Sequence, residues 1–258
     1  MLPADRTGRT NRTIDLSAVA DLLWRADPDH AEEPRPRLSV KLIVRTAIAL
    51  ADAEGLDALS MQRIASELGC TAMALYRHIP SKNQLLAAMT DAATGSPPTP
   101  PAAEAWRSEV EGWVDALWGL YLRHPWILRA PTLNAPVGPN ELAWFEALLS
   151  PLHRAGLDRG DLIPLATFIS SAVRDLARVA AELDPAGAAA YGQVLAERLD
   201  PEQFPTLCSL AGGSGLDEAE DGDVTPIVHH GMQRLLDGIE ARARSNPFPA
   251  PDKEERHG

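Results

Sequence analysis

The stretch LGCTAMALYRHIPSKNQLLAAM, residues 68 to 89, decides the fold. Its glycine at 69 leads into a short run of small and apolar residues, which ends in the polar-tipped Tyr76-Arg77-His78. A fully buried helix would not end in this way, and a fully exposed helix would not carry so many apolar residues. The pattern predicts a short helix that packs on one side and presents its end to something negatively charged.

Apolar residues at helical spacing continue on both sides of this stretch. They predict helices over 39–54, 60–68, 71–78 and 81–93. Ser60, Thr71 and Ser81 each stand where a side chain can cap the helix that follows. The chain shows no alternating strand pattern, so the predicted fold class is all-α.

The rest of the chain divides into an extension, a joint and a long helical part. Residues 1–36 read as a flexible N-terminal extension, within which the amphipathic segment 14–24 is expected to dock as a small helix on the body of the protein. The proline-rich GSPPTPP, 95–101, marks a domain boundary. Beyond it the pattern predicts helices over about 103–124, 126–131, 139–155, 160–183 and 226–244, and further helix starts at the Asp-Pro pairs 184–185 and 200–201.

Composition limits the kind of protein and its partners. The formal net charge is −12, but residues 37–94 hold six basic and five acidic residues, whereas residues 95–258 hold 13 basic and 24 acidic residues. The first of these segments is therefore free to approach phosphate. Two distant cysteines, no signal-peptide pattern and no membrane-spanning run predict a reduced, cytoplasmic setting with no membrane partner.

Three short helices with Gly69 in a tight turn before the last describe a helix-turn-helix, at about 60–79. In that arrangement the final helix enters the major groove of DNA. We expect Leu75 and Ile79 to pack on the three-helix core, and Ala72 and Met73 to lie in the groove.

The residues of 38–94 resemble the DNA-binding domain of the tetracycline-repressor (TetR) family. The resemblance rests on Ala47, Ala49, Gly55, Leu56, Leu59, Ser60, Met61, Ile64, Ala65, Leu68, Gly69, Leu75, Tyr76, His78, Ser81, Lys82, Leu85 and Leu86. Residues 95–258 are similar, more loosely, to the ligand-binding and dimerisation domain of that family, through LYLRHPW (120–126), the GPN start at Gly138 and QRLLDGIE (233–240).

The resemblance implies a set of DNA-binding residues. It places Gln62, Thr71, Ala72, Met73 and Arg77 against bases or the groove, and Tyr76, His78 and Lys82 on phosphates. Glutamine can bond adenine, and apolar side chains can meet the thymine methyl. Two alternatives stand beside it: Tyr76 could be an amphipathic core residue, and His78 a cation that satisfies the carbonyls of a helix end.

The C-terminal part holds most of the large aromatic residues. They could simply pack between helices, or they could line a cavity for a flat, mostly apolar effector. Candidate ligand-binding residues are Trp113, Tyr121, Trp126 and Phe168. No cofactor is expected, and no spacing of histidines and carboxylates predicts a metal site.

The family resemblance also implies a homodimer, joined through the helices at 160–183 and 225–244. A broad apolar face agrees with this, although it could equally be internal core; it consists of Leu165, Ile169, Ala172, Val173, Leu176 and Val179. The expected function is that of a ligand-responsive transcriptional regulator: a homodimeric repressor that is released from a palindromic operator in double-stranded DNA by a small, mostly apolar effector. The alternatives are a helical ligand-binding protein with a vestigial helix-turn-helix, or an enzyme, for which no motif is present.

The N-terminal extension carries three scattered arginines: Arg6, Arg9 and Arg12. A basic arm can reach into the minor groove. Such residues are also commonly just solvated, and the acidic residues at 27–33 dilute their charge.

Overall fold

The computed structural model of the 258-residue chain describes residues 15–25, 38–100, 105–130, 136–182, 194, 197–211 and 225–245. Within these ranges the regular structure is helical, and no strand occurs among them. The predicted all-α fold class is confirmed. The arginines of the N-terminal extension and the helix start at 184–185 lie outside the described residues.

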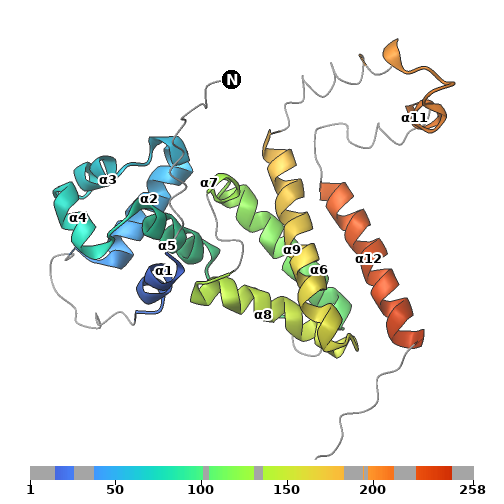
Figure 1. Cartoon of the computed structure of the whole chain (residues 1–258), viewed down its shortest axis with the longest axis horizontal. Coiled ribbons are helices and arrows are strands. Elements are labelled where there is room, and N and C mark those ends of the chain that lie inside the picture. The colour runs from blue at the N-terminus through green and yellow to red at the C-terminus, as the bar shows by residue number, and fades with distance from the viewer. Residues whose placement is uncertain are drawn as a thin grey trace, which may run out of the picture. The chain divides into compact units, whose positions relative to one another are not determined.

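The described residues fall into two compact units (Figure 1). The first is drawn from residues 1–95 and 130–142, and the second from residues 96–129 and 143–258. The helix α8 (Pro139–Arg154) therefore contributes residues 139–142 to the first unit and the remainder to the second.

The first unit contains five α-helices and one short 3-10 helix among its described residues. They are α1 (Leu16–Leu23), α2 (Val40–Glu54), η1 (Leu56–Ala58), α3 (Met61–Glu67), α4 (Ala72–His78) and α5 (Lys82–Thr94). Each of the five α-helices begins with a side-chain cap, whose oxygen accepts a hydrogen bond from a backbone N–H three residues on, at 3.1–3.3 Å. The predicted caps at Ser60, Thr71 and Ser81 are confirmed, which explains why such short helices begin where they do.

The core of the first unit lies among α2, α3, α4 and α5. Contacts join α2 to α3 and to α5, and α3 to α4. Ile43, Ala47, Ile64, Leu75 and Ile79 are each 0 % exposed. Burying each of the larger ones contributes roughly 1.5–3 kcal/mol. The prediction that Leu75 and Ile79 pack on this core is confirmed.

The helix α1 docks on α5, as the amphipathic pattern at 14–24 predicted. The buried side chain of Gln84 donates to the carbonyl of Ala18 at 2.9 Å. The indole N–H of Trp24 donates to the carbonyl of Val137, also at 2.9 Å. Three segments that are distant in sequence therefore meet in the first unit: α1, α5 and the residues that lead into α8.

A buried carboxylate on α5 holds the start of α8. Asp91 Oδ1 accepts hydrogen bonds from the backbone N–H groups of Asn140 at 2.9 Å and Glu141 at 3.0 Å. The side-chain amide of Asn140 donates to Asp91 Oδ2 at 3.1 Å and to the Asp91 carbonyl at 3.0 Å. An anion at this position accepts hydrogen bonds from first-turn N–H groups, and its negative charge is attracted to the positive end of the helix dipole. We call this arrangement the Asp91 clamp.

The cost of the Asp91 clamp is desolvation. Burial raises the pKa of the Asp91 carboxyl above its ordinary value, while the hydrogen bonds from Glu141 and Asn140 act in the opposite direction. The close approach also requires a glycine: a Cβ at Gly138 would lie 2.0 Å from Asp91 Oδ1 and 2.3 Å from Cγ. The sequence GPN at 138–140 is therefore explained by the clamp.

The second unit is built on α6 (Trp106–Arg123) and α9 (Arg159–Glu182), which pack on each other. The short α7 (Trp126–Arg129) contacts both. The Trp113 indole donates to the Trp144 carbonyl at 2.8 Å, and the two rings meet edge to face with centroids 5.8 Å apart. This contact ties α8 to α6. The last described helices are α11 (Pro205–Ala211) and α12 (Thr225–Ser245).

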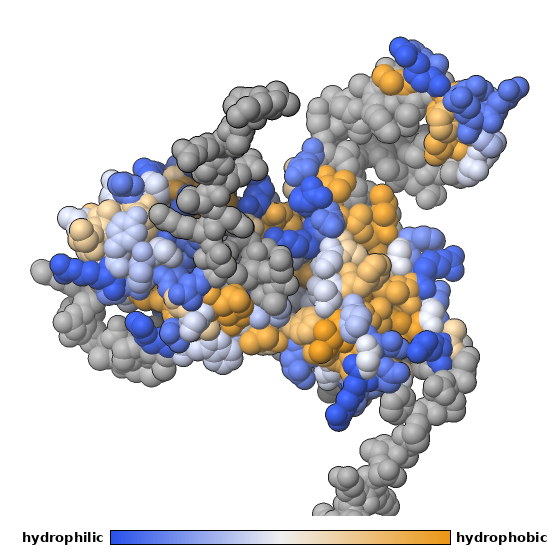
Figure 2. Space-filling model, in the orientation of Figure 1, coloured by the Kyte–Doolittle hydropathy of each residue, from blue (hydrophilic) through white to orange (hydrophobic). Residues whose placement is uncertain are grey.

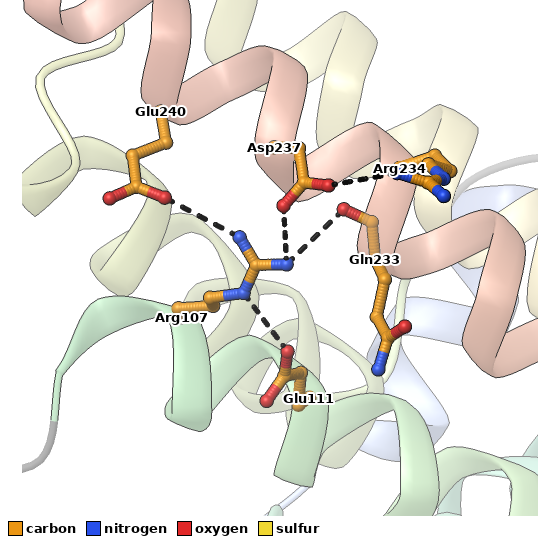
Figure 3. A network of polar contacts seen from close by, with 6 residues as sticks. All are labelled: Arg107, Glu111, Gln233, Arg234, Asp237 and Glu240. Carbon is orange, nitrogen blue, oxygen red and sulfur yellow. Dashed lines mark hydrogen bonds and ion pairs between the residues drawn. The ribbon is translucent and has the colours of Figure 1, made fainter.

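Arg107 of α6 forms ion pairs and a hydrogen bond with polar groups of α12 (Figure 3). Arg107 pairs with Asp237 at 2.9 Å, with Glu240 at 3.5 Å and with Glu111 of its own helix at 3.2 Å. It also donates to the carbonyl of Gln233 at 3.2 Å. A planar guanidinium can serve several acceptors at once, so Arg107 fixes α12 on α6 through most of its donors.

The predicted helix start at Asp200-Pro201 is wrong. Asp200 Oδ1 accepts from the backbone N–H of Glu202 at 2.9 Å, and the Asp200 carbonyl accepts from Gln203 and Phe204. These bonds close a turn over 201–203, and the helix begins later, at Pro205. The aspartate thus closes a local side-chain turn instead of capping a helix. The other predicted helices in the described ranges are confirmed to within three residues.

None of the described helices is both long enough and apolar enough to cross a bilayer.

Replacing Gly138 with alanine should break the Asp91 clamp, since the new methyl group and the carboxylate cannot share the space. We expect the free energy of unfolding to fall by about 2–3 kcal/mol, because a buried charge loses its donors. Denaturant titration of the purified chain measures this. The matched control is Gly112→Ala in the interior of α6, where a Cβ would meet no atom within 4 Å. That variant should gain about 0.5–1 kcal/mol. Equal stability of Gly138→Ala and the wild type would contradict the clamp.

Candidate functional site

The exposed face of α4 is the first candidate site. Met73, Tyr76 and Arg77 follow each other at helical spacing, and Met73 and Tyr76 are 68 % and 44 % exposed. Within the described part of the chain, neither the side chain of Tyr76 nor that of Arg77 forms a hydrogen bond or an ion pair. On the opposite side Leu75 is fully buried. The amphipathic-core alternative for Tyr76 therefore does not hold, since its side chain is exposed.

The turn between α3 and α4 fixes how this face is presented. Gly69 adopts φ 63°, a left-handed conformation that favours glycine. The N–H of Cys70 donates to the carbonyl of Ala65 at 2.9 Å, which satisfies the end of α3. The structure therefore shows the helix-turn-helix that the sequence predicted, with α4 as its second helix.

The positively charged side chains near this face differ in how many of their hydrogen-bond donors already have partners. Arg63 on α3 is paired with Glu54 at 2.7 Å and Glu67 at 3.9 Å. Lys82, at the start of α5, donates to the carbonyl of Leu59 at 3.0 Å. An ammonium has three donors, so Lys82 keeps two for another acceptor. Leu59 directly precedes Ser60, the cap of α3, so the Lys82 charge lies beside the first turn of that helix.

The other sequence-predicted residues of this face are placed as follows. Gln62 is exposed in the first turn of α3, and Thr71 is exposed as the cap of α4. Ala72 and His78 are half-buried at the two ends of α4. We call the set the recognition surface: Gln62, Thr71, Ala72, Met73, Tyr76, Arg77, His78 and Lys82.

The second candidate site is a slot in the second unit, between α6 and α8. Its cavity volume is about 460 Å³. Among the described lining residues six are apolar, Trp113 being the aromatic one, and five carry a polar side chain. The lining residues are Pro98, Thr99, Pro100, Ser108, Glu109, Gly112, Trp113, Ala143, Glu146, Ala147 and Ser150.

A third hollow of about 470 Å³ is an open apolar groove between α9 and α12, near Leu165, Phe168 and Ile239. Phe168 is 60 % exposed there. Tyr121 and Trp126 are buried and line neither the slot nor the groove. The four aromatic residues that the sequence suggested for an effector thus do not share one cavity: Trp113 lines the slot and Phe168 the groove.

Sequence reasoning missed the small residues that shape the slot. Gly112 on α6 and Ala143 and Ala147 on α8 leave room between the two helices, and the one signal for this is the four-residue spacing of the two alanines. It also missed the Asp91 clamp, whose signal was the GPN motif. In the described ranges no three His, Cys, Asp or Glu side chains are grouped so that they could hold a metal ion.

An exposed recognition helix on a capped helix-turn-helix, followed by a helical unit with a ligand-sized cavity, defines a DNA-binding transcription regulator. The profile described as "Bacterial regulatory proteins, tetR family" matches residues 43–89, and that described as "Tetracyclin repressor-like, C-terminal domain" matches residues 98–243. The chain belongs to the tetR family. It is a ligand-responsive DNA-binding repressor, and the family is one of transcription regulators.

Similar proteins come from Streptomyces. The HTH-type transcriptional repressor DrrR1 of Streptomyces coeruleorubidus is 30% identical over 251 residues, which cover 91% of each chain. The crystal structure of apo ActR from Streptomyces coelicolor has a TM-score of 0.69 and 28% identity, and covers 83% of this chain and 99% of ActR. The structure of ActR with actinorhodin has a TM-score of 0.66 and 27% identity, covering 81% and 99%.

Thr71 should stabilise α4 through its cap, because its hydroxyl accepts from the N–H of Ala74 at 3.3 Å. Thr71→Ala should lower the free energy of unfolding by about 1 kcal/mol, whereas Thr71→Ser should keep most of it. Thermal denaturation of the two variants makes the comparison. If serine and alanine were equally destabilising, the threonine methyl group and not the hydroxyl would be the stabilising part.

Proposed function

We propose that this chain is a homodimeric repressor that acts in the cytoplasm and leaves a palindromic operator when a small, mostly apolar effector binds. The observation that carries the proposal is the recognition surface. Two of its polar side chains, Tyr76 and Arg77, are exposed on α4, a helix that is fixed from behind by Leu75 and Ile79. Such a face has no use inside the first unit, and it suits a partner rich in hydrogen-bond acceptors.

In this proposal α4 enters the major groove. Met73, Arg77 and the hydroxyl of Thr71 meet base edges, as does Gln62 from α3. Tyr76, His78 and Lys82 meet phosphates. Ala72 stays small where the helix lies closest to the DNA. Lys82 suits its role because its ammonium is already held beside the first turn of α3, where backbone N–H groups also attract an anion.

Dimerisation is proposed through α9 and α12. Exposed apolar side chains gather over these two helices (Figure 2), among them Ile163, Phe168 and Ile227 at 60 %, 60 % and 54 % exposure. Gly231 and Gly238 stand seven residues apart on α12, and a Cβ at either would meet nothing within 4 Å. An apolar, small-residue surface of this kind supports close helix packing against a second copy. Two recognition helices then reach successive major grooves about 34–36 Å apart.

The effector is proposed to occupy the slot. The likeness to ActR, whose structure was solved with actinorhodin, supports a small-molecule site in the helical unit. The slot has a volume within the range of ligand pockets and a largely apolar lining.

The signal is proposed to travel along α8. This helix lines the slot with Ala143, Glu146, Ala147 and Ser150, and its first turn is held by Asp91 of α5. The chain runs from the recognition helix into α5 through Ile79, Pro80 and Ser81. A displacement of α8 on effector binding would therefore act on α5 directly. A difference of about 1–3 kcal/mol between the two states is enough for such regulation.

Selection of the purified protein against random duplex DNA should enrich a two-fold pseudo-palindrome. Lys82→Gln should weaken binding about equally across the enriched sequences and reduce the salt slope by about 1, since one phosphate contact is lost. Quantitative binding at several salt concentrations provides the measurement.

The matched control is Arg123→Gln, which makes the same charge change at an exposed position of α6, in the second unit. It should leave the slope unchanged. The absence of any enriched sequence with the wild type, after denaturing removal of any carried ligand and refolding, would refute the proposed DNA reader.

Filling the slot should separate effector response from DNA binding. In Gly112→Leu the new side chain enters open space, because a Cβ there meets no atom within 4 Å. We expect operator affinity within about twofold of the wild type and a loss of release by the effector, measured by DNA release during a screen of small molecules. Gly112→Ala, which leaves most of the slot open, is the control. Full release from Gly112→Leu would place the effector elsewhere.

A further inference from the structure

The amide of Gln84 joins α1 to the start of α5. The helix α1 contacts α5, and its Val19 and Leu22 side chains are buried. Gln84 is buried as well, and its Nε2 donates to the carbonyl of Ala18 at 2.9 Å, while its Oε1 accepts from the hydroxyl of Ser81 at 3.3 Å. A carbonyl oxygen can only accept, so Ala18 decides which way round the amide lies and turns Oε1 toward Ser81.

Ser81 is the cap of α5. Its Oγ accepts from the backbone N–H of Gln84 at 3.1 Å, while its hydroxyl donates to Oε1 of the same residue, and this reciprocal arrangement fixes the first turn of the helix. Lys82 is the first residue of that turn, and its ammonium donates to the carbonyl of Leu59 at 3.0 Å. The position of Lys82 is therefore set from two sides, by its own bond to Leu59 and by a cap whose glutamine is held by α1.

The other end of α1 reaches the Asp91 clamp. The indole N–H of Trp24 donates to the carbonyl of Val137, in the residues that lead into α8, at 2.9 Å. Gln84 and Asp91 are seven residues apart on α5, which corresponds to about 10.5 Å of helix. Ala18 and Trp24 are six residues apart, which corresponds to about 9 Å in a helix. The helix α1 therefore spans the interval from the cap of α5 to the clamp.

We propose that α1 belongs to the DNA-binding apparatus, although none of its described residues lies on the recognition surface. Gln84 is a positioning residue: held by α1, it fixes the cap of α5 and so places the Lys82 ammonium where a phosphate of the operator meets it. This inference rests on the proposed function in that Lys82 contacts a phosphate. It adds a determinant of operator affinity that lies behind the surface that reads the DNA.

A double-mutant cycle separates positioning from stability. Gln84→Met keeps the length of the side chain and removes both hydrogen bonds of the amide. On the duplex enriched by selection, it should weaken binding about threefold to tenfold in the wild type, and by less than about 1.5-fold in Lys82→Gln, because the contact that it positions is already absent there. Fluorescence anisotropy with labelled duplex measures the four affinities, and circular dichroism checks that each variant is folded at the assay temperature.

The matched control is Thr94→Val at the other end of the same helix. It removes a side-chain hydrogen bond to the carbonyl of Thr90, at 2.8 Å, and it should leave operator affinity within about 1.5-fold of the wild type. An equal loss in Thr94→Val and Gln84→Met would mean that general loosening of α5 is the cause, and it would overturn the proposal.

A second cycle tests α1 itself. Trp24→Phe keeps a ring and removes the N–H donor to Val137. It should weaken operator binding about twofold to threefold in the wild type and add nothing in Gln84→Met, because both changes act through the same cap. No effect of Trp24→Phe, or a further loss in the Gln84→Met background, would remove α1 from the DNA-binding apparatus.

The first cycle also distinguishes the failure of this inference from that of the proposed function. If Lys82→Gln left the affinity for the enriched duplex unchanged, the proposed phosphate contact would be rejected, and the inference with it. If Lys82→Gln weakened binding and the loss from Gln84→Met were additive to it, the phosphate contact would stand and the positioning role of Gln84 would be rejected alone.

Discussion

The first unit depends on the contact between the Asp91 carboxylate and the first turn of α8. Three hydrogen bonds at 2.9–3.1 Å reach this buried carboxylate, from the backbone N–H groups of Asn140 and Glu141 and from the side-chain amide of Asn140, and they make its burial tolerable. Two neighbouring residues support this contact. Gly138 leaves space for the carboxylate, and the indole N–H of Trp24 donates to the carbonyl of Val137, which precedes it. A buried charge with specific donors adds little net stability, but it does fix one arrangement of its helices. In a regulator, a ligand can shift a helix to a second position only if that helix has one defined position without the ligand.

Much of the fold could be predicted from local signals. Helix starts were indicated by the capping residues Ser60, Thr71 and Ser81, and the turn by Gly69. Caps and left-handed glycines are readable in this way because they act on their immediate neighbours. The recognition surface followed from the same stretch. Apolar spacing placed Leu75 inside, and this put Met73, Tyr76 and Arg77 outside. The failure at Asp200-Pro201 has the same origin, since an aspartate side chain closes a turn as readily as it caps a helix.

What could not be predicted depends on pairs of residues that are distant in sequence. Nothing local to Asp91 indicates that it will receive the start of a helix 49 residues later. Likewise, nothing local to Glu109 indicates that it will pair with Arg154, 45 residues later. The aromatic residues show the same limit. Their composition suggested a cavity, but small residues such as Gly112 and Ala147 make the slot, because a cavity forms where side chains are missing.

The sharing of α8 between the two units has a consequence for how the gene can vary. One end of this helix is fixed in phase by the Asp91 clamp, and the other presents Glu146 and Ser150 to the slot. An α-helix turns by about 100° per residue, so inserting or deleting one residue after Leu142 would turn the slot-lining part of α8 by about that angle relative to the part that the clamp holds. Length changes in that stretch are tolerable only in whole turns. Among relatives of this sequence we therefore expect the number of residues between 140 and 146 to be conserved more strictly than their identity.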